Sequence, residues 1–145
     1  MKIFLFKKKW IALLIMLLGF TLIYSISSYA CRWDSTANKC HPDSCEVVVY
    51  KDSGCKGPNY YCFDGQNQNE WPRISTKNWP DGTNLGDSIS CYVIGYKTKF
   101  YYYEHVNFGG KSVKRENGYT DRLIQQDLGG TWWNDKISSV RVFCK

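Results

Sequence analysis

The chain has 145 residues, of which 43% are hydrophobic and 22% charged, and its formal net charge is +6. This length fits one domain of ordinary size. Much of the positive charge lies at Lys2, Lys7, Lys8 and Lys9; without these four, 15 of the 19 Lys and Arg residues remain against 13 Asp and Glu, a net charge of +2. No basic stripe remains for a nucleic acid, so no nucleic-acid partner is expected.

Residues 1–30 predict a secretory signal peptide. A basic start precedes a mostly apolar run from Trp10 to Tyr24, and the small residues Ser28 and Ala30 place cleavage after Ala30. An uncleaved membrane anchor is the alternative, but the run is shorter than the roughly 20 apolar residues that span a bilayer. We therefore expect a secreted protein.

Seven cysteines follow this segment and predict a disulfide framework, which forms in an oxidising compartment: Cys31, Cys40, Cys45, Cys55, Cys62, Cys91 and Cys144. No Cys-x2-Cys pair indicates zinc. Because seven is odd, Cys31 has two interpretations. As the first mature residue it would be the lipid carrier of a membrane-anchored lipoprotein, although Ser28 and Tyr29 match a lipobox poorly. The alternative is a disulfide from Cys31 to Cys40 or Cys45.

The mature chain predicts an all-β fold. Residues 31–45 form a cysteine-rich extension without periodicity, which we expect disulfides to pin. From residue 46 onward, short β-type runs alternate with turn residues, and no segment has sustained helical periodicity. Strands are predicted at 46–51, within 60–63, weakly around 71–74, and at 88–94, 97–103, 111–115, 119–123 and 137–144, with a turn at 79–82 and one short helical turn at 124–128.

Two unusual hairpins and two polar loops recur in the same order. One hairpin runs from Tyr103 to Gly110 and the other from Tyr50 to Gly57, and each closes on a glycine that suits positive φ or a close approach. The loops are NDKISS at 134–139 and GDSISC at 86–91. The hairpins are 53 residues apart and the loops 48, so the chain predicts two Greek keys packed as a sandwich.

These motifs resemble the βγ-crystallin Greek-key family, in the form of a secreted microbial single domain over residues 46–145. The second motif, residues 96–145, carries the stronger match. Its hairpin contains Tyr103, Phe108 and Gly110, and Ser139 stands where the family's serine ties down the hairpin. The first motif, residues 46–95, departs from the family at two positions.

Both departures are cysteines. Cys55 replaces the second hairpin aromatic, and Cys91 replaces the tethering serine. Because these positions lie close together in the family, the resemblance implies a Cys55–Cys91 disulfide in place of the noncovalent tether. A Cys55–Cys62 bridge across the hairpin is the alternative.

The resemblance also implies calcium binding, with one or two ions. The family's loop reads Asn/Asp, Asn/Asp, any, any, Ser/Thr, Ser, and supplies the hard oxygen ligands that calcium takes. Loop 134–139 fits every position, whereas loop 86–91 has Gly first and Cys last. With hairpin carbonyls added, the implied set is Asn134, Asp135, Lys136, Ser138, Glu104, Asp87, Ser88, Ser90 and Lys51. The alternative is two ordinary turns whose side chains satisfy only the backbone.

Catalysis is not expected, because the only histidines, His41 and His105, lie in predicted loops and no nucleophile–base set accompanies them. Trp132 and Trp133 lie beside the second loop; if exposed, they would contact a protein, glycan or membrane, and core packing is the alternative. The main prediction is a monomeric calcium-binding protein. The alternative is a metal-independent binding module, such as a metalloproteinase inhibitor or killer-toxin-like effector, on the same scaffold.

Overall fold

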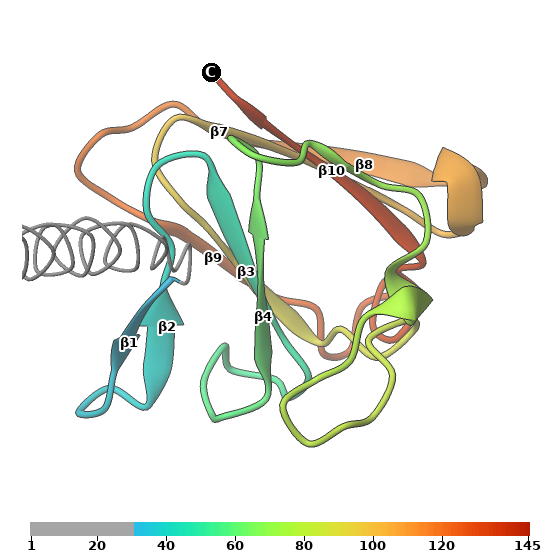
Figure 1. Ribbon diagram of the computed structural model, residues 1–145, viewed down its shortest axis with the longest axis horizontal. Helices are drawn as coiled ribbons and strands as arrows, with labels where there is room; N and C mark the ends of the chain where they lie inside the picture. Colours follow the sequence, from blue (N-terminus) through green and yellow to red (C-terminus); the bar gives the residue numbers. More distant parts are fainter. Residues whose placement is uncertain (1–30) are drawn as a thin grey trace, which may run out of the picture.

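The computed structural model describes residues 31–145, so the predicted signal peptide lies outside the described residues. This part contains two four-stranded antiparallel sheets and a two-stranded hairpin (Figure 1). The strands are β1 (Arg32–Asp34), β2 (Lys39–His41), β3 (Glu46–Tyr50), β4 (Tyr60–Asp64), β5 (Glu70–Trp71), β6 (Cys91–Ile94), β7 (Thr98–Tyr103), β8 (Ser112–Asn117), β9 (Ile124–Asp127) and β10 (Ser139–Cys144); the 3-10 turns are η1 (Ile74–Thr76) and η2 (Val106–Phe108). Within residues 31–145, no helix has the length and apolar character of a membrane span.

The two sheets exchange one strand each. The first has the order β4-β3-β6-β9 and the second β5-β10-β7-β8. Strand β9 comes from the second half of the chain, yet it pairs with β6 of the first half; β5 makes the reverse crossing to β10. Each four-stranded sheet therefore contains one strand from the other half of the chain, and the predicted all-β sandwich is confirmed.

Strand β3 is buried on both faces, which explains its continuous apolar sequence. Val47 and Val49 belong to the core between the sheets, whereas Val48 and Tyr50 belong to a second cluster with Cys31 of the N-terminal segment. Runs without polar alternation are expected for a strand covered on both sides. The segment containing β1 and β2 thus packs over the first sheet, and the sequence expectation of an irregular extension missed this hairpin.

The core between the sheets is mostly aromatic. Its buried members include Phe63, Trp71, Tyr92, Phe100 and Tyr102. Several pairs meet edge to face, as Tyr92 and Phe100 do with ring centroids 5.2 Å apart. Such pairs add about 0.5–1.5 kcal/mol to the free energy gained from burial alone. This packing joins β6, β7 and β10, which adjoin the two polar loops and the second hairpin.

Two local predictions are wrong. Residues 119–123, predicted as a strand, form an irregular loop, and residues 124–128, predicted as a helical turn, contain β9. Gln125 and Gln126 are exposed on this edge strand. The strand forms because its backbone pairs with β6, and its side chains carry no apolar alternation that would reveal it. The strand predicted from residue 88 begins only at Cys91.

Three disulfides join the described cysteines: Cys31–Cys40, Cys45–Cys144 and Cys55–Cys91. The Cys55–Cys91 pairing implied by the resemblance is present, and the Cys55–Cys62 alternative is wrong. Cys31 follows the disulfide interpretation, because its sulfur is bonded to Cys40 and not left for a lipid. Cys62 is the free thiol, and burial raises its pKa to about 12.

Candidate metal centre

Both hairpins fold back on themselves as the sequence pattern predicts. Gly110 has φ of +73° and Gly57 of +100°, a region in which a side chain is strained. A Cβ on Gly110 would also approach the His105 ring to 2.8 Å. At the tip of the second hairpin, Asn107 and Phe108 adopt positive φ as well. These conformations direct backbone carbonyls of the second hairpin toward the loop that contains Ser138 and Ser139.

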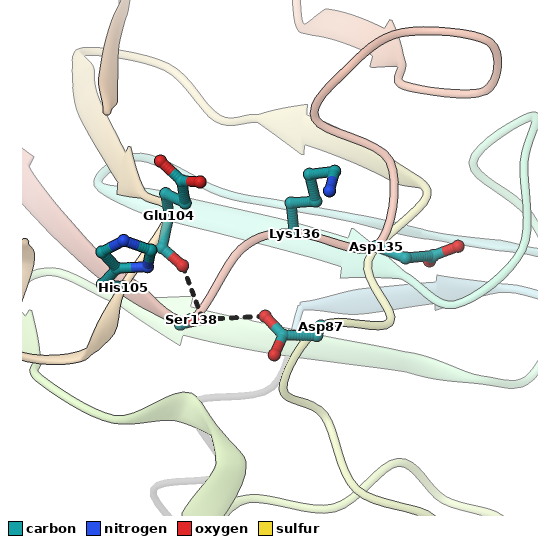
Figure 2. Close-up of a pocket in the computed structure, with 6 residues that line it drawn as sticks. All are labelled: Asp87, Glu104, His105, Asp135, Lys136 and Ser138. Carbon is teal, nitrogen blue, oxygen red and sulfur yellow. Dashed lines mark hydrogen bonds between the residues drawn. The ribbon is translucent and has the colours of Figure 1, made fainter. Parts of the chain in front are cut away.

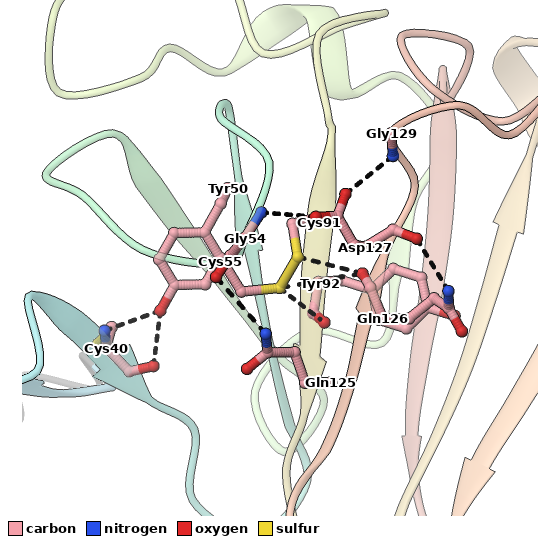
Figure 3. Close-up of a disulfide and its surroundings, with 10 residues drawn as sticks. All are labelled: Cys40, Tyr50, Gly54, Cys55, Cys91, Tyr92, Gln125, Gln126, Asp127 and Gly129. Atoms are coloured by element: carbon pink, nitrogen blue, oxygen red, sulfur yellow. Dashed lines mark hydrogen bonds between the residues drawn. A yellow bond between two sulfur atoms is a disulfide. The ribbon is translucent and has the colours of Figure 1, made fainter.

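The two hairpins are held by different chemistry at equivalent positions. In the second motif, the Phe108 N–H donates to the Ser139 hydroxyl (3.0 Å), which itself donates to the His105 carbonyl (2.6 Å). In the first motif, the Cys55–Cys91 disulfide makes the same connection, with Cα atoms 5.1 Å apart (Figure 3). A covalent bond therefore replaces two hydrogen bonds.

Asp127 adds a second tether to the first hairpin. Its carboxylate accepts the Gly54 N–H and the Gly129 N–H, each at 2.8 Å (Figure 3). Sequence reasoning did not single out Asp127, and nothing in the local sequence marks it, because its role depends on the unpredicted strand β9. Together these contacts join the first hairpin to β9 and to the start of the loop that follows it.

An open pocket of about 270 Å³ lies where three segments meet (Figure 2). One is the loop before β6, the second is the hairpin after β7, and the third is the loop before β10. The lining residues are Asp87, Glu104, His105, Asp135, Lys136 and Ser138. Five of these six residues were predicted as ligands from the sequence, and His105 is the addition.

Ser138 is the centre of this pocket. Its Oγ lies 2.8 Å from the Asp87 carboxylate and 2.7 Å from the Glu104 carbonyl oxygen. A hydroxyl has one proton and cannot donate fully to both acceptors. Three electron-rich oxygen atoms from distant parts of the sequence thus converge on one point, an arrangement that a cation would stabilise. The hydroxyl of the neighbouring Ser139 differs, because it accepts one hydrogen bond, from the Phe108 N–H, and donates one, to the His105 carbonyl.

A second, looser serine–aspartate pair occupies the position related to the first by the pseudo-symmetry of the two motifs. The Ser90 hydroxyl is 3.4 Å from the Asp135 carboxylate, and the Asp135 N–H donates to the Ile89 carbonyl at 3.2 Å. In both pairs, the serine of one loop faces the aspartate of the other loop. Asp87 and Asp135 share a left-handed backbone, with φ of 52° and 55°. The left-handed turn at each aspartate is therefore common to both loops.

This crossing differs from the pairing of side chains assumed in the expected ligand sets, which remain predictions. Loop 134–139 was expected to use its own Asn134 or Asp135 with Ser138, and to take a carbonyl from the other motif's hairpin. The structure instead places Ser138 beside Asp87 of the other motif and beside the Glu104 carbonyl of its own motif. The sequence motif gives the types of ligand in order, but it does not show which of the two loops supplies the remaining ligands of each site.

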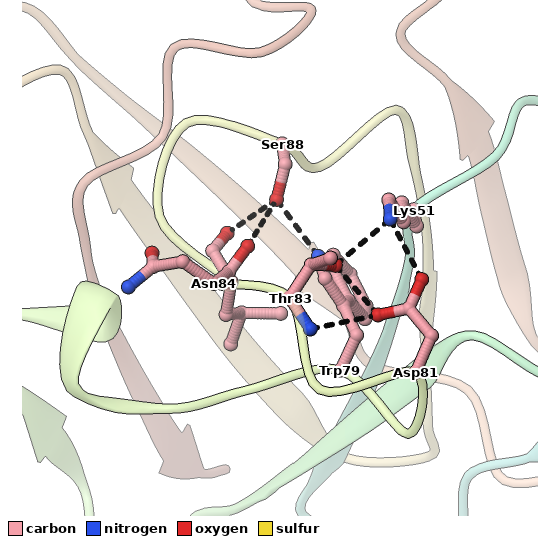
Figure 4. Close-up of polar contacts among 7 residues, drawn as sticks. Lys51, Trp79, Asp81, Thr83, Asn84 and Ser88 are labelled. Atoms are coloured by element: carbon pink, nitrogen blue, oxygen red, sulfur yellow. Dashed lines mark hydrogen bonds and ion pairs between the residues drawn. The ribbon is translucent and has the colours of Figure 1, made fainter.

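The other predicted side chains are engaged elsewhere. The Lys51 ammonium contacts Asp81 at 2.7 Å and Thr83 at 2.8 Å, and the Ser88 hydroxyl accepts the Trp79 Nε1–H at 2.8 Å (Figure 4). The hydrogen bond from Lys51, with those from Thr83, lowers the pKa of Asp81 to about 2. Lys51 and Ser88 can therefore offer a metal only their carbonyl oxygens, as the resemblance implies.

Asn134 lies beside the pocket but does not line it. Its amide donates to the Asp135 carboxylate at 2.6 Å, and its amide oxygen is buried without a hydrogen-bond partner in residues 31–145. Among the residues that line the pocket, Asp87, Glu104, Asp135 and Ser138 supply carboxylate, hydroxyl and carbonyl oxygens, and His105 and Lys136 add an imidazole and an ammonium group. No cluster of three or more His, Cys, Asp or Glu side chains suited to a metal occurs in the described chain. Hard oxygens of this kind suit calcium and not zinc.

Comparison with solved structures identifies the architecture. The chain superimposes on a structure from work on the evolution of the eye lens βγ-crystallin domain fold with a TM-score of 0.57 and 23% identity, over 72% of this chain and 90% of the other. Spherulin 3a from Physarum polycephalum matches with a TM-score of 0.51 and 24% identity, over 80% and 95%. A βγ-crystallin domain from Clostridium beijerinckii matches with 0.51 and 18%, over 67% and 95%.

The chain is thus an all-β sandwich of two exchanged, hairpin-bearing motifs. Its fold is that of a βγ-crystallin domain, and the structural resemblance predicted from the motifs is confirmed across most of the chain. No protein-family model and no curated protein matches by sequence. The likeness at these identities concerns the fold, so function must be argued from the residues of the site.

Proposed function

We propose that this protein is a secreted, non-enzymatic βγ-crystallin-like domain that binds calcium between its two motifs. The observation that supports the proposal is that the Asp87 carboxylate and the Glu104 carbonyl both lie within hydrogen-bond distance of the Ser138 hydroxyl. Lys136 lines the same pocket, and its carbonyl would be the fourth ligand of this site. Bound calcium would supply positive charge at the point where the Asp87, Ser138 and Glu104 oxygen atoms meet.

A second, weaker calcium site is proposed at the pseudo-equivalent position. Asp135 and Ser90 would be its side-chain ligands, and Ser88 and Lys51 would contribute backbone carbonyls. The Ser90–Asp135 distance of 3.4 Å is longer than the 2.8 Å between Ser138 and Asp87. Its oxygens are therefore less closely assembled before an ion arrives, and we expect it to fill at higher calcium concentration.

Calcium at the first site would join segments from both halves of the chain, because Asp87 precedes β6 and Ser138 precedes β10. The unfolded chain does not assemble these oxygens, so calcium would bind the folded state selectively. Sites with few carboxylates in extracellular modules have dissociation constants on the order of 10⁻⁴–10⁻³ M. Calcium at 100 times the dissociation constant would raise the free energy of unfolding by about 2.7 kcal/mol.

Calorimetric titration and thermal melting of the oxidised protein test this proposal. The wild type should bind calcium and melt higher with calcium than with a chelator. Asp87→Asn should remove most of that shift, because the carboxylate charge is lost while the side-chain shape is kept. Asp121→Asn, on an exposed loop residue outside the pocket, is the matched control and should melt like the wild type. Identical melting with calcium and with chelator, together with no binding heat, would refute the proposal.

The proposed location agrees with the cysteine chemistry. Three disulfides indicate an extracellular or otherwise oxidising environment. We propose export by the amino-terminal segment and cleavage after Ala30. Mass spectrometry of the protein recovered from the culture medium should give a mature chain that begins at Cys31 and carries no lipid. A lipid-modified Cys31 would contradict the disulfide at this residue.

A further inference from the structure

Trp132 lies exposed beside the candidate calcium pocket. Its side chain keeps 42% of its surface exposed, whereas Trp71 and Trp79 are buried in the core. Trp133, its neighbour, is half-buried and packs edge to face on Tyr102 with ring centroids 4.9 Å apart. A tryptophan ring has an apolar body and one polar N–H, which suits a boundary that is apolar on one side and wet on the other. Trp133 anchors the loop, and Trp132 remains available to a partner.

Two lysines accompany this ring. The Lys111 ammonium lies 4.2 Å from the Trp132 ring centroid, and the Lys136 ammonium lies 5.2 Å from it. Lys136 also lines the pocket that Asp87 and Ser138 form (Figure 2). The exposed tryptophan, the two ammonium groups and the oxygen-lined pocket therefore form one continuous surface, to which we refer as the Trp132 rim.

Calcium would reverse the sign of the charge on this surface. The pocket carries three carboxylates, from Asp87, Glu104 and Asp135, and the rim adds two ammonium groups, from Lys111 and Lys136. The formal sum is −1 without calcium and +1 with one calcium ion. The four ligands proposed for the first site are also fewer than the six to eight oxygens that calcium takes. Positions therefore remain for oxygen atoms from an anionic partner.

We propose that the Trp132 rim docks the protein on an anionic phospholipid surface when calcium is bound, an inference that rests on the proposed calcium site. Tryptophan prefers the boundary between headgroups and acyl chains, and lysines near an anionic surface each contribute roughly a fivefold gain in binding. The two ammonium groups over the Trp132 ring hinder flat stacking by a sugar. The open pocket leaves room for a phosphate oxygen at the calcium position.

Vesicle sedimentation of the mature oxidised protein tests this docking. The vesicles contain phosphatidylcholine alone or mixed with phosphatidylserine, with calcium or with a chelator. Binding should require both phosphatidylserine and calcium. Lys111→Gln should lower it roughly fivefold, and Trp132→Ala should lower it at least as much. Trp33→Ala is the matched control, because Trp33 has a similar exposed fraction of 38% and lies in the N-terminal hairpin.

Calorimetric calcium titration of the same variants separates the two proposals. Trp132→Ala should bind calcium like the wild type while losing vesicle binding. Normal calcium binding without vesicle binding by the wild type would overturn the docking inference and leave the proposed calcium site intact. Absence of calcium binding would overturn both. Vesicle binding that survives chelation or Trp132→Ala, or binding to a soluble sulfated polysaccharide and not to vesicles, would also overturn the docking inference.

Discussion

The disulfides should contribute unequally to stability, in the order of the chain length that each one closes. The sequence separations are 99 residues for Cys45–Cys144, 36 for Cys55–Cys91 and 9 for Cys31–Cys40. Loop-closure entropy in the unfolded chain then gives about 4.7, 3.8 and 2.6 kcal/mol of stabilisation at 25 °C. Small domains have total stabilities of about 5–15 kcal/mol. Loss of the longest bridge should therefore remove a large share of the free energy of unfolding.

Urea denaturation of paired alanine variants measures this order. Each variant replaces both cysteines of one bridge, and all are unfolded under non-reducing conditions with chelator, so that calcium makes no contribution. The Cys45→Ala/Cys144→Ala variant should lose roughly 2 kcal/mol more than Cys31→Ala/Cys40→Ala, by the difference between the two entropy values. Equal losses in two variants with native circular dichroism would refute the assignment of this difference to loop closure.

Two further predictions concern buried polar groups. The Tyr50 hydroxyl accepts the Cys40 N–H and donates to the Cys40 carbonyl, each at 2.8 Å. Tyr50→Phe should therefore lower the free energy of unfolding in urea by about 1–3 kcal/mol, because the buried Cys40 groups lose their partner. Tyr119→Phe, at an exposed residue, should change it little, and equal losses in the two variants would contradict the role of the Tyr50 hydroxyl. Burial raises the pKa of Cys62 to about 12, above its unfolded value near 9, so the protonated thiol stabilises the fold at neutral pH and this contribution declines as pH rises above about 9. Cys62→Ala should weaken the loss of stability between pH 8 and 10, and an unchanged pH profile would contradict the prediction.

The sequence predicts those parts of this fold that depend on local chemistry. Positive φ at Gly57 and Gly110 follows from the hairpin pattern, and the buried run of β3 follows from consecutive valines. Strand β9 escapes prediction because its pairing energy comes from backbone contact with β6. Its two glutamines give no apolar alternation from which the strand could be inferred.

The residue types of the candidate site were predictable from the sequence, but the pairing between its two loops was not. The residue types at 134–139 and 86–91 indicate oxygen ligands, and the pocket gathers Asp87, Asp135 and Ser138 as expected. The crossing of Ser138 to Asp87 depends on how the two sheets face each other. That relation arises from the exchange of β5 and β9, which involves residues distant in sequence from both loops.

The Cys45–Cys144 bridge has a mechanical consequence. Cys45 precedes β3 and Cys144 ends β10, so the disulfide joins the residue before the first strand of the sandwich to the last residue of its final strand. A pulling force applied between residues 45 and 144 would pass through one covalent bond. The strands between them would carry almost none of that load, and the domain would behave as an inextensible link until the bond was reduced.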